Sequence, residues 1–283
     1  WRLGQPDQIG NTIVQASWDY RKGDALLGVA PPVSGGNPAA VNVSVGLNAQ
    51  QFITGPTFGY FEDPQLIELS PNTGPTLGAT LVTLSGTDFS GGSLYRCRFG
   101  QTLTQASVSR DTLHQLRCQL PQLLLGTHTV EITLNGQEFS TSGLIFSVYA
   151  EPQPSSLSPS SGPVMGSTLV QVQVQGANVS IGSHYLCRFG AAVVPATYAE
   201  DENRLDCYAP PRQEPSAPPI NSTSGLPGTV ILDVSLNGQN YSASALGYTY
   251  YLPPLPVQAC PTTGPELGST KVLLSSLHYS NGS

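Results

Sequence analysis

The sequence predicts an all-β protein built from several copies of a small two-layer β-sandwich. Two observations lead to this fold class: three short signatures recur in a fixed order, and apolar and polar residues alternate with a period of two inside each copy. The 283 residues include 30 Gly and 25 Pro, and only 10% are charged, which favours turns and short strands over long charged helices. No run of about 18 apolar residues is present to span a bilayer.

The first signature is Ser-Pro-x-x-Gly-Pro-x-x-Gly-x-Thr. It begins at Ser70 and Ser158, and a third copy begins with Cys260 in place of Ser. The second is Cys-Arg-Phe-Gly followed by Leu-x-Cys-x-x-Pro, and it begins at Cys97 and Cys187. A fixed order of signatures at this spacing is typical of tandem domains.

The third signature, Leu-Asn-Gly-Gln plus an aromatic residue, begins at Leu134 and Leu236, with a weaker copy at Leu47. The three signatures together predict four segments. They are a divergent or truncated upstream module over 1–65, complete units over 66–151 and 152–252, and the truncated start of a further unit over 253–283. The second complete unit carries a Pro- and Ser-rich insertion at 211–226, which we expect to be an exposed loop. We expect the chain to be an internal piece of a longer protein.

Strand patterns fill each unit. Residues 170–174, Val-Gln-Val-Gln-Val, alternate as a half-buried strand does, and 130–134 and 41–45 alternate in the same way. Asn-Gly at 135–136 and at 237–238 predicts two-residue type I′ hairpin turns, whereas Asn-Ala at 48–49 predicts a different or looser turn. About six to eight short strands in a unit of about 90 residues predict an immunoglobulin-like sandwich.

Several positions that recur in the signatures have an expected structural role. Gly74 and Gly162 are expected where the chain turns from the linker into its first strand, and Pro71 and Pro159 are expected to stiffen that entry by fixing φ. Two facing pairs are expected in the cores: Phe99 with Leu116, and Phe189 with Leu205.

Together the three signatures resemble the IPT/TIG domain, an early-set immunoglobulin-like sandwich. The resemblance covers residues 66–252 well, 253–283 as an opening half and about 40–65 as a closing half, while residues 1–40 match none of the signatures. The family includes plexin and Met-like receptor ectodomains, fibrocystin-like surface proteins, surface glycoproteins of algae and protists, and DNA-contacting domains. The Cys-Arg-Phe-Gly form of the second signature is similar to fibrocystin-like and flagellar surface proteins.

Four of the five cysteines form two pairs at matching places in the two units. Cys97 and Cys118 are 21 residues apart, and Cys187 and Cys207 are 20 apart, so one disulfide per unit is the favoured interpretation. Such bonds persist in oxidising compartments, and we therefore expect an extracellular or cell-surface location. The alternatives are reduced cysteines packed as small apolar residues and, less favoured, a zinc site. Cys260 is left to pair outside the fragment or with another chain.

Asn-x-Ser/Thr acceptors for N-glycosylation occur five times and agree with an extracellular location. They are Asn42, Asn178, Asn221, Asn240 and Asn281. Asn221 lies in the insertion and is the acceptor that we most expect to be occupied. Asn42 and Asn240 lie on or beside strands, where the acceptor can remain empty.

Nothing in the sequence specifies a reaction. The four His residues fall in unrelated contexts, and we predict no catalytic residue, cofactor or metal site. The acidic group of Glu200, Asp201, Glu202 and Asp206 is interpreted as a solvated loop, with a calcium site as the alternative. Aromatic residues at the ends of the units are expected in cores and between domains. Arg96, Arg98 and Arg188 are expected to project outward as ordinary surface charge.

The sequence therefore predicts a non-catalytic structural or adhesive segment of a large secreted or surface-anchored glycoprotein, with tandem sandwiches forming a stiff rod. The short connector at 149–154 contains two Pro, which restrict tumbling of neighbouring units. The expected partners are other protein chains, including copies of itself or a filament or coat component, and covalent glycans. The net charge of −7 disfavours nucleic acid. The alternatives are the stalk of a plexin- or Met-like receptor and an accessory domain of a carbohydrate-active enzyme.

Overall fold

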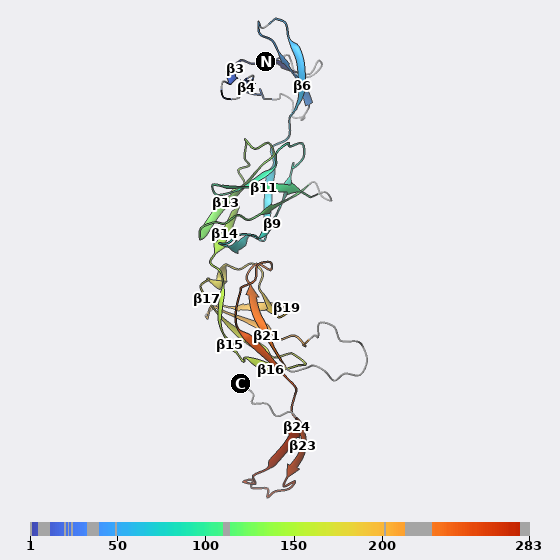
Figure 1. Ribbon diagram of the computed structural model, residues 1–283, viewed down its shortest axis with the longest axis vertical. Helices are drawn as coiled ribbons and strands as arrows, with labels where there is room; N and C mark the ends of the chain where they lie inside the picture. The colour runs from blue at the N-terminus through green and yellow to red at the C-terminus, as the bar shows by residue number, and fades with distance from the viewer. Residues whose placement is uncertain are drawn as a thin grey trace, which may run out of the picture.

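The computed structural model describes residues 2–4, 12–19, 21, 23, 25–32, 40–48, 50–109, 114–200, 202–212 and 228–277. The molecule is elongated, and its parts follow one another along a single axis in chain order (Figure 1). Two complete β-sandwiches, here called unit 1 and unit 2, occupy the middle of the row, with smaller groups of strands at each end. The prediction of tandem immunoglobulin-like sandwiches is confirmed. In the described ranges, no helix is long and apolar enough to cross a membrane.

Unit 1 contains eight strands in the order β7-β9-β12-β11-β10-β13-β14-β8. Its strands are β7 (Gln65–Ser70), β8 (Thr73–Pro75), β9 (Leu81–Thr87), β10 (Arg96–Phe99), β11 (Thr102–Val108), β12 (Gln115–Gln119), β13 (Gly126–Thr133) and β14 (Ile145–Tyr149). Neighbouring strands are antiparallel, except that β8 and β14 are parallel. The first half of β11 pairs with β10 and its second half with β12, so this strand passes from one layer of the sandwich to the other.

Unit 2 repeats this order as β15-β17-β20-β19-β18-β21-β22-β16. Its strands are β15 (Gln153–Ser158), β16 (Ser161–Pro163), β17 (Leu169–Gln175), β18 (Leu186–Phe189), β19 (Ala192–Ala199), β20 (Arg204–Tyr208), β21 (Gly228–Ser235) and β22 (Gly247–Tyr251). A short 3-10 helix, Val179–Ile181, follows β17. The predicted insertion at 211–226 lies outside the described residues except for its first two positions.

The cores form on the inward faces of the alternating strands, as the period of two predicts. Phe99 and Leu116 in unit 1, and Leu205 in unit 2, are 0% exposed, and Phe189 is 3% exposed. Phe99 meets Phe146 edge to face at 5.7 Å between ring centroids, and Phe189 meets Tyr248 in the same way at 5.2 Å. Burying one such ring stabilises the fold by about 1.5–3 kcal/mol. Both predicted Phe–Leu pairs are therefore core residues.

The two ends contain smaller sheets. The strands before unit 1 are β1 (Arg2–Gly4), β2 (Thr12–Ile13), β3 (Ala16–Asp19), β4 (Ala25–Gly28), β5 (Ala40–Val45) and β6 (Ile53–Gly59). After unit 2, β23 (Leu255–Cys260) pairs with β24 (Leu273–Leu277) in the register of β7 with β9 and β15 with β17. Val272 is 52% exposed in this hairpin, whereas its equivalents Val82 and Val170 are 0% exposed inside complete sandwiches.

Two predictions about local backbone were wrong. Gly74 and Gly162 lie inside the short strands β8 and β16 and not at a turn. Glycine is needed there for space, because a Cβ on Gly74 would lie 2.7 Å from Thr80 Oγ1 and 2.8 Å from Leu120 Cδ2. The left-handed backbone occurs instead at Gly78 and its equivalent Gly166, with φ of 77° and 79°.

The type I′ turns are the second correction. Such a turn needs positive φ at both central residues, yet only Gly136 and Gly238 of each Asn-Gly pair have it. In unit 2 the loop is closed by the pairing of Ser235 with Tyr241, which leaves five residues between them. The hairpin position was predicted correctly, but the turn is longer and is stabilised by the Asn side chain.

Candidate functional site at the junction of the two sandwiches

The loop over residues 236–240, here called the docking loop, is shaped by Asn237. Its Oδ1 accepts hydrogen bonds from the backbone N–H groups of Gln239 (3.1 Å) and Asn240 (2.9 Å), which is an Asx turn. Asn237 is 3% exposed because the loop lies against unit 1. The Asn-Gly-Gln sequence therefore builds a rigid projection at the end of unit 2 that faces the preceding sandwich.

The opposing surface, here called the acceptor turn, is formed by residues 73–81 of unit 1. Gly78 and Ala79 both have positive φ, 77° and 65°, so the chain reverses there and places Thr80 under the docking loop. A Cβ on Gly78 would lie 2.6 Å from the Leu120 carbonyl oxygen, so only glycine fits. Thr80 is 0% exposed. The first signature of the repeat thus encodes one half of the junction.

Asparagine side chains connect the docking loop to the acceptor turn. The Thr80 hydroxyl donates to Asn240 Oδ1 at 2.6 Å and accepts from Asn237 Nδ2 at 3.2 Å. Asn237 Nδ2 also lies 3.2 Å from the Thr73 carbonyl oxygen, and Asn240 Nδ2 donates to the Gly78 carbonyl oxygen at 3.4 Å. These polar groups are therefore satisfied across the junction as well as within their own unit.

Gln239 pairs with the backbone of Leu81 as a neighbouring strand would. Its Oε1 accepts from the Leu81 N–H at 2.9 Å, and its Nε2 donates to the Leu81 carbonyl oxygen at 3.0 Å. Leu81 is the first residue of β9, so the side-chain amide extends the hydrogen bonding of that strand end. This two-point contact fixes orientation as well as distance.

The connector between the units also bonds back to unit 1. Glu151 Oε1 accepts from the Leu77 N–H at 3.1 Å and from the Thr76 hydroxyl at 3.4 Å. Tyr149, the last residue of β14, is 1% exposed and belongs to the apolar cluster of unit 2. Burial, and then the nearby Glu151 carboxylate, raise the pKa of Tyr149. The linker is therefore anchored in both domains.

The two hydrogen bonds that Asn237 Nδ2 donates to unit 1 are buried, whereas those between Gln239 and Leu81 are exposed. Leaving a buried donor or acceptor without its partner costs about 1–3 kcal/mol, so a tilt that broke the Asn237 bonds without admitting water would be unfavourable. A connector without these bonds would allow the units to reorient freely. The geometry favours one fixed angle between the two sandwiches.

The arginine of each Cys-Arg-Phe-Gly signature packs against the strand and the aromatic residue that flank the Asn-Gly loop. This role was not predicted. Arg188 pairs with Asp233 (2.6 Å) and stacks on the ring of Tyr241, which lies 4.3 Å away at the end of the docking loop. Arg98 pairs in the same way with Glu131 and stacks on Phe139 at 3.9 Å. The interpretation of Arg98 and Arg188 as ordinary surface charge was therefore wrong. Each arginine contacts both an acid on the neighbouring strand of the sheet and an aromatic residue after the Asn-Gly loop.

The predicted cysteine pairs are joined in the structure. Cys97 on β10 is bonded to Cys118 on β12 with 6.4 Å between Cα atoms, and Cys187 on β18 to Cys207 on β20 with 6.5 Å. Each bond connects the two layers of its sandwich, and all four cysteines are at most 1% exposed. Cys260 is exposed and not part of a disulfide in the described part of the chain.

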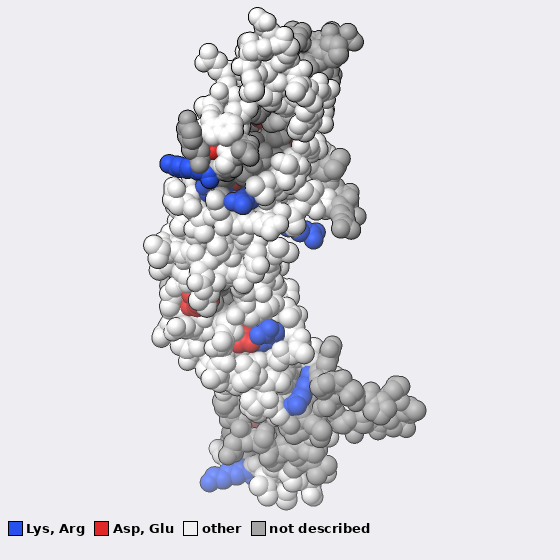
Figure 2. All heavy atoms as spheres, turned by 45° about the horizontal axis from the view of Figure 1, so that its top comes forward, with Lys and Arg blue, Asp and Glu red and all other residues white. Residues whose placement is uncertain are grey.

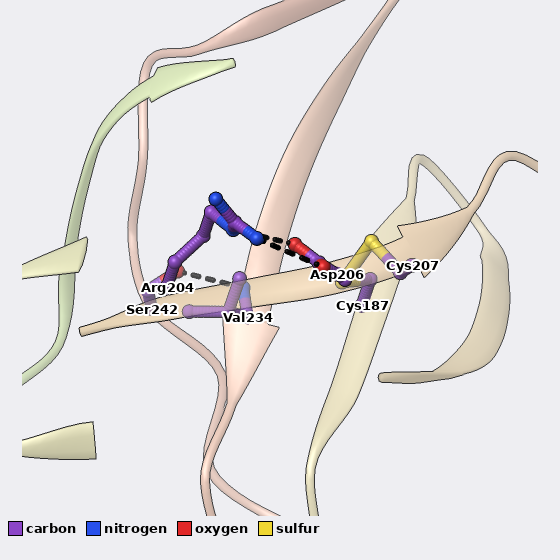
Figure 3. The surroundings of a disulfide bond; sticks show 6 residues. All are labelled: Cys187, Arg204, Asp206, Cys207, Val234 and Ser242. Carbon is purple, nitrogen blue, oxygen red and sulfur yellow. Dashed lines mark hydrogen bonds and ion pairs between the residues drawn. A yellow bond between two sulfur atoms is a disulfide. The ribbon is translucent and has the colours of Figure 1, made fainter. Parts of the chain in front are cut away.

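The acidic group near β20 is neutralised in part by Arg204. Its guanidinium bonds to Asp206 at 2.8 Å and also pairs with Glu202, while Asp201 lies outside the described residues. Figure 3 shows Arg204 and Asp206 together on the strand that carries Cys207. No group of three or more His, Cys, Asp or Glu residues suited to a metal ion occurs among the residues that the structure describes.

Most aromatic residues at the ends of the complete units are buried, as predicted, and Tyr251 is half-buried. Phe146, Tyr149, Tyr248 and Tyr250 are at most 2% exposed. Phe58, an aromatic residue at the end of the segment before unit 1, is 39% exposed. The visible surface of the molecule carries few charged side chains (Figure 2), in line with the 10% charged composition.

The glycosylation acceptors differ in their surroundings. Asn42 on β5 and Asn178 before the 3-10 helix are exposed. Asn240 lies in the junction, where both of its side-chain polar atoms are hydrogen-bonded to unit 1. Asn221 and Asn281 lie outside the described residues.

Comparison with known proteins places the fold. The chain is similar to the extracellular region of plexin A4, domains 1 to 10, with 17% identity and a TM-score of 0.50 over 86% of this chain and 23% of the plexin chain. A second plexin A4 structure, domains 1 to 8, matches at 18% identity and a TM-score of 0.43 over 67% of this chain and 18% of that one. Invasin, a bacterial integrin-binding protein, matches at 15% identity and a TM-score of 0.26 over 83% and 49% of the respective chains.

The first of these likenesses shows the fold, and the chain spans about a quarter of that plexin. The model of the IPT/TIG domain matches residues 64–148, which are unit 1 from just before β7 to the end of β14. Residues 64–148 are therefore an IPT/TIG domain, and the sandwich that follows repeats its strand order.

Proposed function

We propose that the chain is a non-catalytic structural or adhesive segment of a large extracellular or cell-surface glycoprotein, in which IPT/TIG sandwiches are joined head to tail into a stiff rod. The observation that supports this proposal most directly is the hydrogen-bonded junction between units 1 and 2. Its docking loop and acceptor turn bury Thr80 and Asn237 at 0% and 3% exposure. Such a contact holds a defined angle that assembly or adhesion requires.

Both halves of the junction recur along the chain. Unit 1 has its own docking loop, with Asn135 Oδ1 accepting from the N–H groups of Gln137 (3.0 Å) and Glu138 (3.2 Å). The acceptor turn recurs with φ of 79° at both Gly166 and Gly268. Even Asn48 makes the same two turn bonds, at 3.1 and 3.0 Å, although we expected a looser turn there. A unit that carries one half at each end is suited to serial addition.

Two disulfides support a place outside the cell, because such bonds persist in oxidising compartments. The partners that fit this role are other protein chains, including copies of this one or a filament or coat component. The Cys-Arg-Phe-Gly form of the second signature favours the narrower placement among fibrocystin-like and flagellar or ciliary surface proteins.

The proposal is tested by measuring how firmly the units hold their angle. Spin labels are attached at Ser107→Cys and Thr197→Cys, exposed and equivalent positions on β11 and β19, in a Cys260→Ser background. Double electron–electron resonance spectroscopy then gives the distribution of the distance between the two labels. We expect one narrow peak, and a peak at least twice as wide in Gln239→Ala/Asn240→Ala.

Gln137→Ala/Glu138→Ala is the matched control, because these residues occupy the same loop positions in unit 1 without a hydrogen bond to a neighbouring unit in the described ranges. It should leave the peak narrow. An equally broad peak in the unaltered chain would reject the stiff rod.

A second candidate function is the stalk of a plexin- or Met-like receptor. It is favoured by the plexin A4 alignment, which covers 86% of this chain. The two candidates differ in the rest of the protein, so sequencing the complete transcript separates them. A ligand-binding head and a cytoplasmic signalling part would favour the receptor, and many further IPT/TIG units would favour the rod.

A further inference from the structure

A mostly apolar crevice lies between the two sandwiches beside their junction. Its volume is about 440 Å³, and residues of both units line it, among them Leu125, Tyr149, Ala150, Gly176 and Ile181. Leu125 is 61% exposed at its rim, next to Leu124 at 83%. Apolar surface that stays open to water is a place where a further group can be buried.

Asn178 lies on the wall of this crevice and begins the acceptor sequence Asn-Val-Ser. Its Oδ1 accepts from the Ser180 N–H at 3.1 Å and from the Ser180 hydroxyl at 2.8 Å. Those bonds hold the amide and the hydroxyl of the acceptor sequence together on an exposed turn. In the described part of the chain, Asn178 Nδ2, the atom to which an N-linked sugar attaches, donates no hydrogen bond.

Unit 1 lacks this combination. Asp88 stands nine residues before Cys97, as Asn178 stands nine residues before Cys187, so the equivalent position of unit 1 is not an acceptor. Asn240 also differs, because its Nδ2 and Oδ1 both bond to the acceptor turn. A sugar on Asn240 would displace the junction, whereas one on Asn178 would extend from the rim of the crevice.

We propose that Asn178 carries an N-linked glycan whose first sugar covers the crevice between the sandwiches. The proposal rests on the extracellular placement proposed above. In the attachment, a bond forms between Asn178 Nδ2 and C1 of N-acetylglucosamine. The bond from C1 to a lipid-linked diphosphate breaks, the diphosphate leaves, and the amide proton passes to a base. The C–H face of the sugar then contacts Leu125 and Ile181, and its hydroxyl groups stay in water.

The test uses the full chain secreted from eukaryotic cells. Peptide mass spectrometry measures glycan occupancy at Asn178 and at Asn240. Hydroxyl-radical footprinting then measures the oxidation of Leu125 and Ile181 in three forms of the same protein: with the whole glycan, with a single sugar left by an endoglycosidase, and with none after treatment with a peptide amidase.

We expect occupancy at Asn178 and none at Asn240. Oxidation of Leu125 and Ile181 should be low in the first two forms and rise at least threefold in the third, while that of Leu103, an exposed residue on β11, stays constant. An unmodified Asn178, or equal oxidation in all three forms, would overturn the proposal. The spin-label experiment tests the stiff rod separately from the glycan. A broad distance distribution together with low oxidation of Leu125 would reject the stiff rod and still support the glycan at Asn178.

Ser180→Ala removes the acceptor sequence and keeps Asn178. This variant should give the high oxidation of the amidase-treated form. If its footprint at Leu125 and Ile181 matched that of the glycosylated protein, the sugar would have no covering role.

Discussion

The docking loops of units 1 and 2 have the same backbone and different surroundings. Asn135 and Asn237 make the same two Asx-turn bonds, and a glycine with φ of 79° or 76° follows each. Gln137 and Gln239 are both exposed, and in unit 1 Asn135 Nδ2 bonds to Glu138 within the loop. In unit 2, Gln239 pairs with Leu81 of the neighbouring domain.

This difference shows that the loop does not acquire its shape from the contact. It is formed by local hydrogen bonds in both settings and is therefore ready for a partner before one is present. Preorganisation of this kind lowers the entropy lost when the units dock. The repeat signature specifies the shape, and the position in the chain decides whether the loop is covered.

Among the predictions that compare the two units, removal of a disulfide should change the free energy of unfolding the most. We expect Cys187→Ala/Cys207→Ala to destabilise unit 2 by about 3 kcal/mol, because a closed loop of that length restricts the unfolded chain by this amount in the chain-entropy model. Unit 1 should keep its own fold and lose its partner at the junction. Hydrogen exchange with peptide resolution, measured against urea, reports the two units separately.

Cys97→Ala/Cys118→Ala is the converse experiment and should move the loss to unit 1. If either pair of substitutions unfolded both units equally, the sandwiches would be one cooperative body and not two jointed ones.

The two units should differ in their stability at alkaline pH. Unit 2 buries Tyr248 and Tyr250 where unit 1 has Phe146 and Val148. Burial raises the pKa of Tyr250 to about 12, with a smaller contribution from Tyr248, and the pKa of Tyr248 is also raised by burial. Because the folded state favours the protonated phenols, their contribution is intact below pH 10 and declines as the pH rises through 12.

Unit 2 should therefore unfold before unit 1 on titration from pH 9 to pH 12. Circular dichroism and hydrogen exchange in a Cys260→Ser background, which lacks the free thiol, measure this. Tyr248→Phe restores the residue type of unit 1 and should narrow the gap. Loss of unit 1 first would show that buried phenols do not control alkaline stability here.

Much of the fold could be predicted from the sequence because the repeats compare the chain with itself. The pairs Cys97–Cys118 and Cys187–Cys207 were recognisable from their matching places, and Phe99 and Leu116 from alternation on strands. These features depend on residue type and spacing, which are visible in one chain.

The junction could not be predicted in this way. Gln137 and Gln239 occupy the same signature position, and in the part of the chain that the structure describes the second alone bonds to a neighbouring unit. The role of Arg188 depends on Asp233 and Tyr241, which lie far from it in the sequence and meet it only in the folded unit. The comparison of Glu138 with Asn240 offered a signal, because a charged residue suits an exposed loop and an amide suits a half-buried contact between units.

Exchanging these two side chains tests that signal and should give the smallest of the expected changes. In Asn240→Glu the new carboxylate can accept from the Thr80 hydroxyl but cannot donate to the Gly78 carbonyl oxygen, and it brings a charge into the contact. We expect the junction to lose about 1.4 kcal/mol, which is a tenfold change in its closing equilibrium. The Leu81 N–H, which Gln239 covers, should then exchange about tenfold faster.

Glu138→Asn makes the reverse exchange in unit 1 and should leave the Leu81 exchange rate unchanged, since Glu138 bonds within its own loop and makes no hydrogen bond to unit 2 in the described ranges. Equal rates in both variants would mean that the amide of Asn240 is interchangeable with a carboxylate, and that the other bonds of the junction hold it without this amide. A tenfold difference would show that a single position of the repeat signature distinguishes the docked loop of unit 2 from the loop of unit 1, which makes no hydrogen bond to a neighbouring unit in the described ranges.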